Sequence, residues 1–247
     1  MRYFIELSYD GSPFVGWQRQ PKGDSVQSCL EDALKKLLQK PISVVGAGRT
    51  DAGVHARQLF AHVDLDDQVD QNLKFRLNKL LPKEIAVNSI LAVTDDAHAR
   101  FDATGRRYFY HITTQKDPFL KKRSYYFFKT LDIELMNQAA TDMLDHDDFK
   151  CFSKSRTDVK TYLCDIQEAY WEQNGSDLVF FIQSNRFLRN MVRAIVGTLI
   201  EVGLKKISID DFKSILLSRD RSKAGYSVPA HGLYLEKVYY PKHIFAV

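Results

Sequence analysis

The stretch Gly46-Ala47-Gly48-Arg49-Thr50-Asp51-Ala52-Gly53-Val54-His55-Ala56 lies between two apolar segments, at 42–45 and 59–65. Its three glycines allow tight turns and a close approach of the backbone to another group, because glycine has no Cβ. The alternation of apolar and polar residues in the second segment is typical of a strand. We therefore predict a polar loop between two strands, with the carboxylate of Asp51 at its centre.

Two familiar phosphate-binding loops do not fit this stretch. The dinucleotide fingerprint requires a glycine where Asp51 stands, and a P-loop ends in Gly-Lys-Ser/Thr. Two interpretations of Asp51 remain: a turn residue that caps its own backbone, or a reactive carboxylate presented by the loop. The adjacent Arg49 and Thr50, set between glycines, favour the second.

Composition narrows the class of protein. The chain has 247 residues, of which 45% are hydrophobic, so it can form one large domain or two modest ones. A net charge of +4 is compatible with a polyanionic partner. Three cysteines without a C-x-x-C pair argue against a disulfide framework or a thiolate zinc site. Neither a signal peptide nor a membrane span is evident, so we expect a soluble, cytoplasmic protein.

Strand and helix patterns alternate along the rest of the chain. We predict strands at 2–9, 85–93, 164–172, 177–184 and 233–240, another from Tyr108 onward, and helices at about 25–38, 73–81, 133–144, 186–203 and 209–217. Residues 146–162 and the Arg/Ser/Gly-rich segment after 217 read as an exposed and a flexible loop. Hairpins and short links indicate an α+β fold with two halves, at 1–102 and 103–247, each laying helices on a sheet.

Two segments combine basic and aromatic residues, a pattern suited to gripping a phosphate backbone and stacking bases. Trp17 and Arg19 lie in the loop 12–23. Arg106, Arg107 and Tyr108 begin a strand in which Arg106 and Tyr108 share one face, and Arg107 takes the other. The alternatives are a core position for Trp17 and an ordinary strand with a solvated, charged edge.

The predicted helix 186–203 carries a row of arginines. Arg186, Arg189 and Arg193 stand at positions i, i+3 and i+7, with Gly197 continuing the same face. Three aligned guanidinium groups could receive phosphates or a carboxylate. Solvated arginines are the alternative interpretation.

These motifs together resemble one family. The stretch 46–56 is similar to the tRNA pseudouridine synthases of the anticodon stem-loop (the TruA family). The other segments that carry this resemblance are Tyr9-Asp10-Gly11, Gly16-Trp17-Gln18-Arg19-Gln20, Arg106-Arg107-Tyr108-Phe109-Tyr110, 191–197 and His231-Gly232-Leu233-Tyr234-Leu235. The resemblance implies two similar halves that share a long, mostly antiparallel mixed sheet, with helices on one side and the active cleft between the halves. It also implies a homodimer that binds tRNA and isomerises uridine at positions 38, 39 and 40 without a cofactor or metal.

The resemblance assigns roles to single residues. Asp51 falls at the catalytic aspartate, Tyr108 at the tyrosine that packs on the flipped-out base, and Arg193 at the arginine that pairs with the aspartate. Arg49 is a further cation that would favour the ionised carboxylate. The predicted tRNA contacts comprise Tyr108, Arg19, Trp17, Arg106, Arg107, Arg186, Arg189 and Leu233.

Two other functions would use some of the same residues. A tRNA-binding or chaperone module without catalysis would use the same basic and aromatic residues, but it would gain nothing from Asp51. A metal-dependent hydrolase would combine Asp51 with His55 and His62, which stand seven residues apart, a poor arrangement for a shared ligand set.

Overall fold

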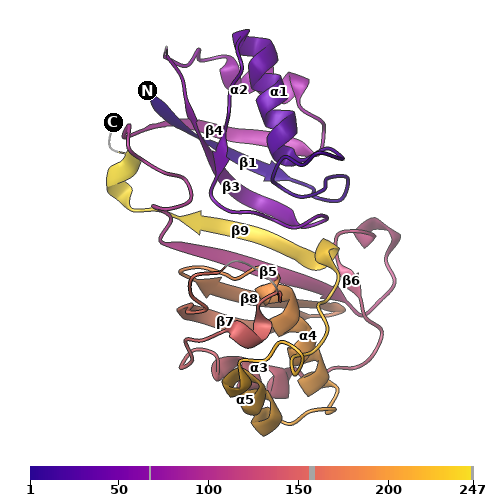
Figure 1. Ribbon diagram of the computed structural model, residues 1–247. Coiled ribbons are helices and arrows are strands. Elements are labelled where there is room, and N and C mark those ends of the chain that lie inside the picture. Colours follow the sequence, from indigo (N-terminus) through magenta and orange to yellow (C-terminus); the bar gives the residue numbers. More distant parts are fainter. Residues whose placement is uncertain (67, 156–158, 246–247) are drawn as a thin grey trace. The chain divides into compact units, whose positions relative to one another are not determined.

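The computed structural model describes residues 1–66, 68–155 and 159–245, which form two compact units (Figure 1). Unit 1 comprises Met1–Thr104 together with the C-terminal segment from Tyr234, and unit 2 comprises Gly105–Leu233. The first boundary lies two residues from the expected one at 102/103. The C-terminal segment, which we had placed with the second half, belongs to unit 1 because its strand pairs with a strand of that unit.

Unit 1 is built on the strand order β4-β1-β3-β9. Strand β1 (Arg2–Tyr9) pairs antiparallel with β3 (His55–Asp64) and with β4 (Ile85–Val93). The short β2 (Val45–Gly46) pairs antiparallel with β3, and β9 (Leu233–Tyr239) runs parallel to it, with His55 opposite Tyr234. The loop 47–54 is thus held at both ends by strands of one sheet, as its flanking sequence predicts.

Two helices complete unit 1: α1 (Val26–Leu38) and α2 (Leu73–Leu80). Helix α1 begins at a capping box, in which the Ser25 hydroxyl accepts the backbone N–H of Ser28 and the Ser28 hydroxyl accepts that of Ser25. The helix ends at Gln39, which adopts a left-handed conformation with φ 55°. Its buried face confirms the 3.6-residue spacing read from the sequence.

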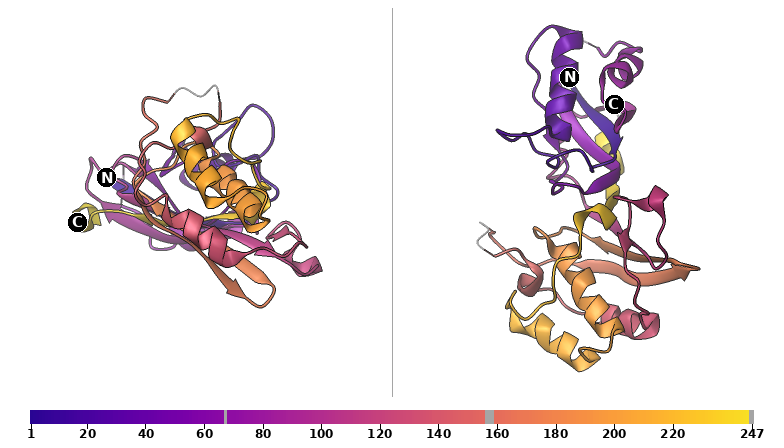
Figure 2. Two further views of the ribbon diagram at one scale, coloured as in Figure 1. Left: turned by 90° about the horizontal axis from the view of Figure 1, so that it is seen from below. Right: turned by 90° about the vertical axis from the view of Figure 1, so that its right-hand side faces the viewer.

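Unit 2 has the strand order β5-β8-β7. Strands β5 (Gly105–Thr113), β8 (Asp177–Ser184) and β7 (Ile166–Asn174) pair antiparallel, and β6 (Tyr125–Tyr126) runs parallel to β5. Helices α3 (Ile133–Thr141), α4 (Met191–Gly203) and α5 (Ile209–Ser218) lie together on one side of this sheet (Figure 2, right). Short 3-10 helices span Pro118–Leu120, Lys150–Phe152, Ala230–Gly232 and Lys242–Phe245. The α+β class is confirmed.

One of the two loop predictions is wrong. Within the stretch 146–162, of which 156–158 lie outside the described residues, Phe149, Cys151 and Phe152 are fully buried rather than exposed. Burial raises the pKa of the Cys151 thiol to about 12. The segment 219–229 is a loop, as expected, in which Arg221 donates to the carbonyls of Ala224 and Gly225 at 3.2 and 3.0 Å. Its flexibility stays a prediction.

Candidate active site

Asp51 stands at the start of a tight turn in unit 1. The N–H of Val54 donates to the Asp51 carbonyl at 3.1 Å, and Gly53 has φ +78°, the conformation that the third position of a type II turn requires. The preceding residue, Thr50, is buried, and its hydroxyl lies 2.9 Å from the Tyr9 hydroxyl of β1. Asp51 itself is half-buried. The turn and the buried Thr50 therefore fix the backbone that carries the carboxylate.

The loop 12–23 forms the support beneath this turn. Trp17 is 3% exposed, and its backbone N–H donates to the Thr50 carbonyl at 3.1 Å. A Cβ on Gly46 would lie 2.5 Å from the Trp17 ring, so the ring packs directly on the backbone of β2. These contacts favour the core interpretation of Trp17 over base stacking. Its expected tRNA contact stays a prediction.

His55 joins three segments of unit 1. Its Nδ1 accepts the N–H of Gly11 at 3.1 Å, and its ring stacks on Tyr234 of β9 with the centroids 4.5 Å apart. Asp10 Oδ1 also lies 3.2 Å from Nδ1. His55 thus holds the end of the loop against the sheet.

Two arginines of unit 1, the predicted Asp51 neighbour Arg49 and the predicted tRNA contact Arg19, differ in their surroundings. Arg49 is exposed, and within the described part of the chain its side chain makes no hydrogen bond or ion pair. Arg19 instead bonds Glu31 and Asp32 of α1 at 2.9 and 3.0 Å. Two carboxylates already offset the charge of Arg19, which weakens it as a phosphate ligand.

Tyr108 belongs to β5 in unit 2. Its strand neighbours on the same face, Tyr110 and Ile112, are fully buried, whereas Tyr108 is half-buried near the end of this face. The edge of the Phe187 ring meets Tyr108 with the centroids 5.1 Å apart. Arg106, on the same face by alternation, donates to the Asn185 carbonyl at 3.0 Å.

Arg107 points to the opposite face of the unit 2 sheet, as its place in the alternation predicts. Its guanidinium bonds Glu168 Oε2 at 2.7 Å and the Tyr170 hydroxyl at 2.9 Å, and it lies 4.6 Å from the Phe181 ring centroid. This is a cross-strand ion pair with a cation–π contact. Both contacts support a structural role for Arg107.

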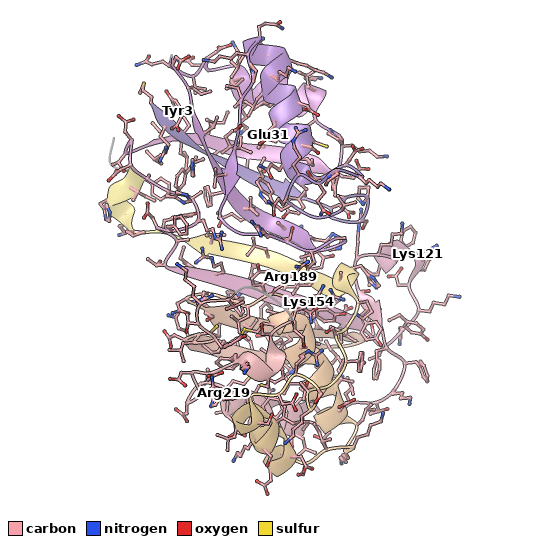
Figure 3. The ribbon with its side chains drawn as sticks, in the orientation of Figure 1. Tyr3, Glu31, Lys121, Lys154, Arg189 and Arg219 are labelled. Atoms are coloured by element: carbon pink, nitrogen blue, oxygen red, sulfur yellow. The ribbon has the colours of Figure 1, made fainter. Side chains whose placement is uncertain are left out.

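The prediction that three arginines share one face of a helix is wrong. Helix α4 begins only at Met191, because Asn190 adopts a left-handed conformation with φ 66°. Arg186 and Arg189 precede the helix. Arg186 donates to the Thr161 carbonyl at 3.4 Å. The carbonyl of Arg189 accepts the backbone N–H of Lys154 at 3.0 Å, and Figure 3 labels Arg189 and Lys154.

Arg193 is the one member of the row that α4 carries. Its Nε donates to the Val228 carbonyl at 2.7 Å, and its own carbonyl accepts the Val228 N–H at 3.2 Å. Gly197, one turn on, lies against the Tyr226 carbonyl, which a Cβ there would meet at 1.8 Å. The face of α4 that we expected to receive a ligand is thus partly filled by the segment 226–228.

Several supporting residues escaped the sequence interpretation. Phe187 and Asn190 belong to no motif, although Asn190 directly precedes an apolar run, a usual sign of a helix start. Tyr9 belongs to the Tyr9-Asp10-Gly11 motif, but the sequence does not show its contact with Thr50. Leu233, an expected tRNA contact, is buried at the start of β9.

The histidines of the rival metal site serve other contacts. His62 Nδ1 accepts the N–H of Ala99 at 3.1 Å, and His55 Nδ1 is occupied as described above. Among the described residues, no group of three or more His, Cys, Asp or Glu side chains is arranged to hold a metal ion. No helix in this part of the chain is both long and apolar enough to cross a membrane.

Comparison with known proteins places these residues in a family context. The sequence pattern of the tRNA pseudouridine synthase family matches residues 7–102 and 139–241. The chain is 52% identical to tRNA pseudouridine synthase A of Parabacteroides distasonis, over 100% of this chain and 98% of the relative. The protein of that name from Porphyromonas gingivalis is 51% identical, with 99% of both chains covered. The one from Bacillus subtilis is 40% identical, with 97% of this chain and 99% of the relative covered.

Proposed function

The chain belongs to the tRNA pseudouridine synthase A family, a family of isomerases, and we propose that it converts uridine to pseudouridine at positions 38, 39 and 40 of the anticodon stem-loop. In this proposal Asp51 is the catalytic carboxylate. The observation that supports this role most directly is the fixed turn at Asp51, whose backbone is anchored through Thr50 and Val54. A half-buried acid on a rigid loop is pre-positioned for chemistry.

The reaction defines what the carboxylate must do. The bond from C1′ to N1 of uracil breaks, the base turns over, and C1′ bonds to C5, whose hydrogen leaves as a proton while N1 gains one. An ionised carboxylate can attack C1′ or C6, or it can take the C2′ proton. The product has the same atoms and oxidation state as the substrate, so we expect no cofactor and no metal.

Tyr108 is the residue that we assign to the flipped-out uracil. A uridine must leave its stack to reach a catalytic group, and an aromatic ring can support the extruded base. The edge contact from Phe187 holds the Tyr108 ring in one orientation. In a Tyr108→Phe variant the ring remains, so we expect slower turnover with much of the base stacking kept. Turnover equal to that of the wild type would show that the hydroxyl has no part.

Arg193 is assigned as the cation that keeps the catalytic aspartate ionised. Its Nε is held by the Val228 carbonyl, which restricts the direction of the guanidinium. An Arg193→Lys variant keeps the charge and loses the planar group. We expect it to retain more activity than Arg193→Met, because the methionine removes the charge as well.

We further propose that the protein acts as a cytoplasmic homodimer on tRNA, as the family resemblance implies. The tRNA contacts expected of Arg106 and Arg186 belong to this proposal. Sedimentation of the purified protein measures the mass of the particle, and a monomer at micromolar concentration would contradict the dimer.

Tritium release from tRNA labelled at uracil C5 tests the catalytic assignment. We expect wild type to release tritium without added metal or nucleotide, and Asp51→Asn to bind tRNA but release none. Asp96→Asn, an exposed acid of the same unit, is the matched control and should behave as wild type. Full release by Asp51→Asn would overturn the assignment. Binding without release by the wild type would instead favour the non-catalytic tRNA-binding module.

Mapping of pseudouridine in the product tests the positions. We expect modification at 38, 39 and 40 in tRNAs that carry uridine there. Modification confined to another arm of the tRNA would contradict the proposed specificity while leaving the chemistry intact.

A further inference from the structure

A second surface of unit 2 has the composition of an RNA-binding site. Residues 116–129, which we call the basic arm, connect β5 to α3 and include β6 (Figure 1). The arm contains five basic residues and the single acid Asp117, which gives it a net charge of +4, equal to that of the whole chain. The basic residues are Lys116, Lys121, Lys122, Arg123 and Lys129. All five are exposed, and Figure 3 labels Lys121 at the outer end of the arm.

Large aromatic side chains accompany these charges. Phe119 is 84% exposed, Phe128 71% and Tyr126 47%. Aromatic rings are mostly buried in globular proteins, and a group of exposed rings in one segment marks an interaction surface. Tyr126 and Phe128 lie beside each other, with their ring centroids 6.5 Å apart.

The backbone of the arm is held in place. The carboxylate of Asp117 accepts the N–H of Phe119 at 2.8 Å, so the single acid serves as the cap of the short helix Pro118–Leu120. The N–H of Ser124 donates to the Leu120 carbonyl at 3.0 Å, and that of Phe127 to the Thr113 carbonyl at 2.9 Å. The exposed rings and charges are therefore presented on a fixed frame rather than on a loose tail.

The arm starts close to the proposed base-binding tyrosine. Five residues of β5 separate Tyr108 from Thr113, a distance of about 17 Å along an extended strand. The strand pairing of β6 with the last residues of β5, Ile112 and Thr113, sets the base of the arm at this end of the sheet. A folded RNA with one uridine at Tyr108 can therefore reach the arm with its adjoining backbone.

From these observations we propose that the basic arm is a second tRNA-contact surface, in which lysines bind phosphates and Phe119 stacks on an unpaired base of the same RNA. Positive charge interleaved with exposed aromatic rings is complementary to a nucleic acid with unstacked bases. The inference rests on the proposed function for its substrate, but it concerns binding and is measured apart from catalysis.

Equilibrium binding of unmodified tRNA at several salt concentrations tests the arm. Lys121→Ala combined with Lys122→Ala removes two charges, and Phe119→Ala removes the ring. The matched control combines Lys35→Ala with Lys36→Ala, two exposed lysines of α1 in unit 1, and removes the same charge. Thermal unfolding of each variant checks that the fold is kept.

We expect the double lysine variant to reduce the slope of log K against log salt by about 1.4 to 1.8, since each lost phosphate contact contributes about 0.7 to 0.9. Phe119→Ala should weaken binding by about tenfold without changing that slope. Wild-type affinity and slope in both arm variants would overturn the proposal. Unchanged affinity with a smaller particle mass would overturn it too, and would identify the arm as a contact between copies of the chain.

The two proposals fail in different ways. Loss of tRNA affinity in the arm variants, when wild type releases no tritium, would support the arm and contradict the isomerase. Tritium release by wild type, with unaltered binding by the arm variants, would support the isomerase and contradict the arm.

Discussion

Alanine at Gly46 should disrupt the support of the loop 47–54 that carries Asp51, whereas alanine at Gly48 should not. A Cβ on Gly46 would lie 2.5 to 2.7 Å from three atoms of the Trp17 ring, whereas a Cβ on Gly48 meets nothing within 4 Å. To reach an ordinary contact of 3.4 Å, the ring has to recede by about 0.9 Å from the closest atoms. Overpacking of this kind costs about 1–3 kcal/mol of the free energy of unfolding.

The same displacement should lower turnover. The backbone N–H of Trp17 donates to the carbonyl of Thr50, the residue before Asp51, so we expect a shift of Trp17 to displace the Asp51 carboxylate. Misplacement by about 1 Å can reduce a rate by about 100-fold. Urea unfolding and tritium release are measured for both variants, with Gly48→Ala expected within about 0.5 kcal/mol of wild type. Equal stability and equal turnover of the two variants would refute the packing argument.

Two further predictions concern unit 1. Burial lowers the pKa of His62 from 6.5 to about 4, and the positive charges of Arg2 and His98 add to this effect. The unfolded chain therefore binds a proton more readily than the folded one. The free energy of unfolding should fall by about 1–3 kcal/mol as the pH falls from about 6.5 to about 4. Urea unfolding across this range measures the loss, and a His62→Gln variant with an equal loss would contradict it. Tyr9→Phe should cost about 1–2 kcal/mol in unfolding and slow tritium release, because it removes the hydroxyl that contacts Thr50. The matched control Tyr3→Phe, whose hydroxyl accepts the Val69 N–H at 3.3 Å, should leave turnover unchanged, and equal slowing of both variants would remove the special role of Tyr9.

The elements around the loop 47–54 were predictable because local signals there agree with the packing. Alternation in β1 and the capping serine of α1 set the bounds of those elements to within a residue. The position of Asp51 between two strands of one sheet follows from the same kind of pattern.

The structures of two regions were predicted wrongly, because the local sequence pattern in each indicated a different structure. Arg186 and Arg189 fit a helical spacing, but the left-handed Asn190 interrupts the chain before α4, and periodicity carries no information about one residue's φ. The polar composition of 146–162 hides Phe149, Cys151 and Phe152, which reach the core through a single 3-10 turn.

The parallel pairing of β9 with β3 makes unit 1 discontinuous in the chain. During synthesis, residues 105–233 emerge before Tyr234 can stack on His55. At about 5–20 residues per second, that interval lasts roughly 6 to 26 seconds. His55 at the end of the loop 47–54 therefore stays uncovered during this interval, and unit 2, whose sequence is continuous, can fold first. Completion of the packing around this loop is thereby tied to completion of translation.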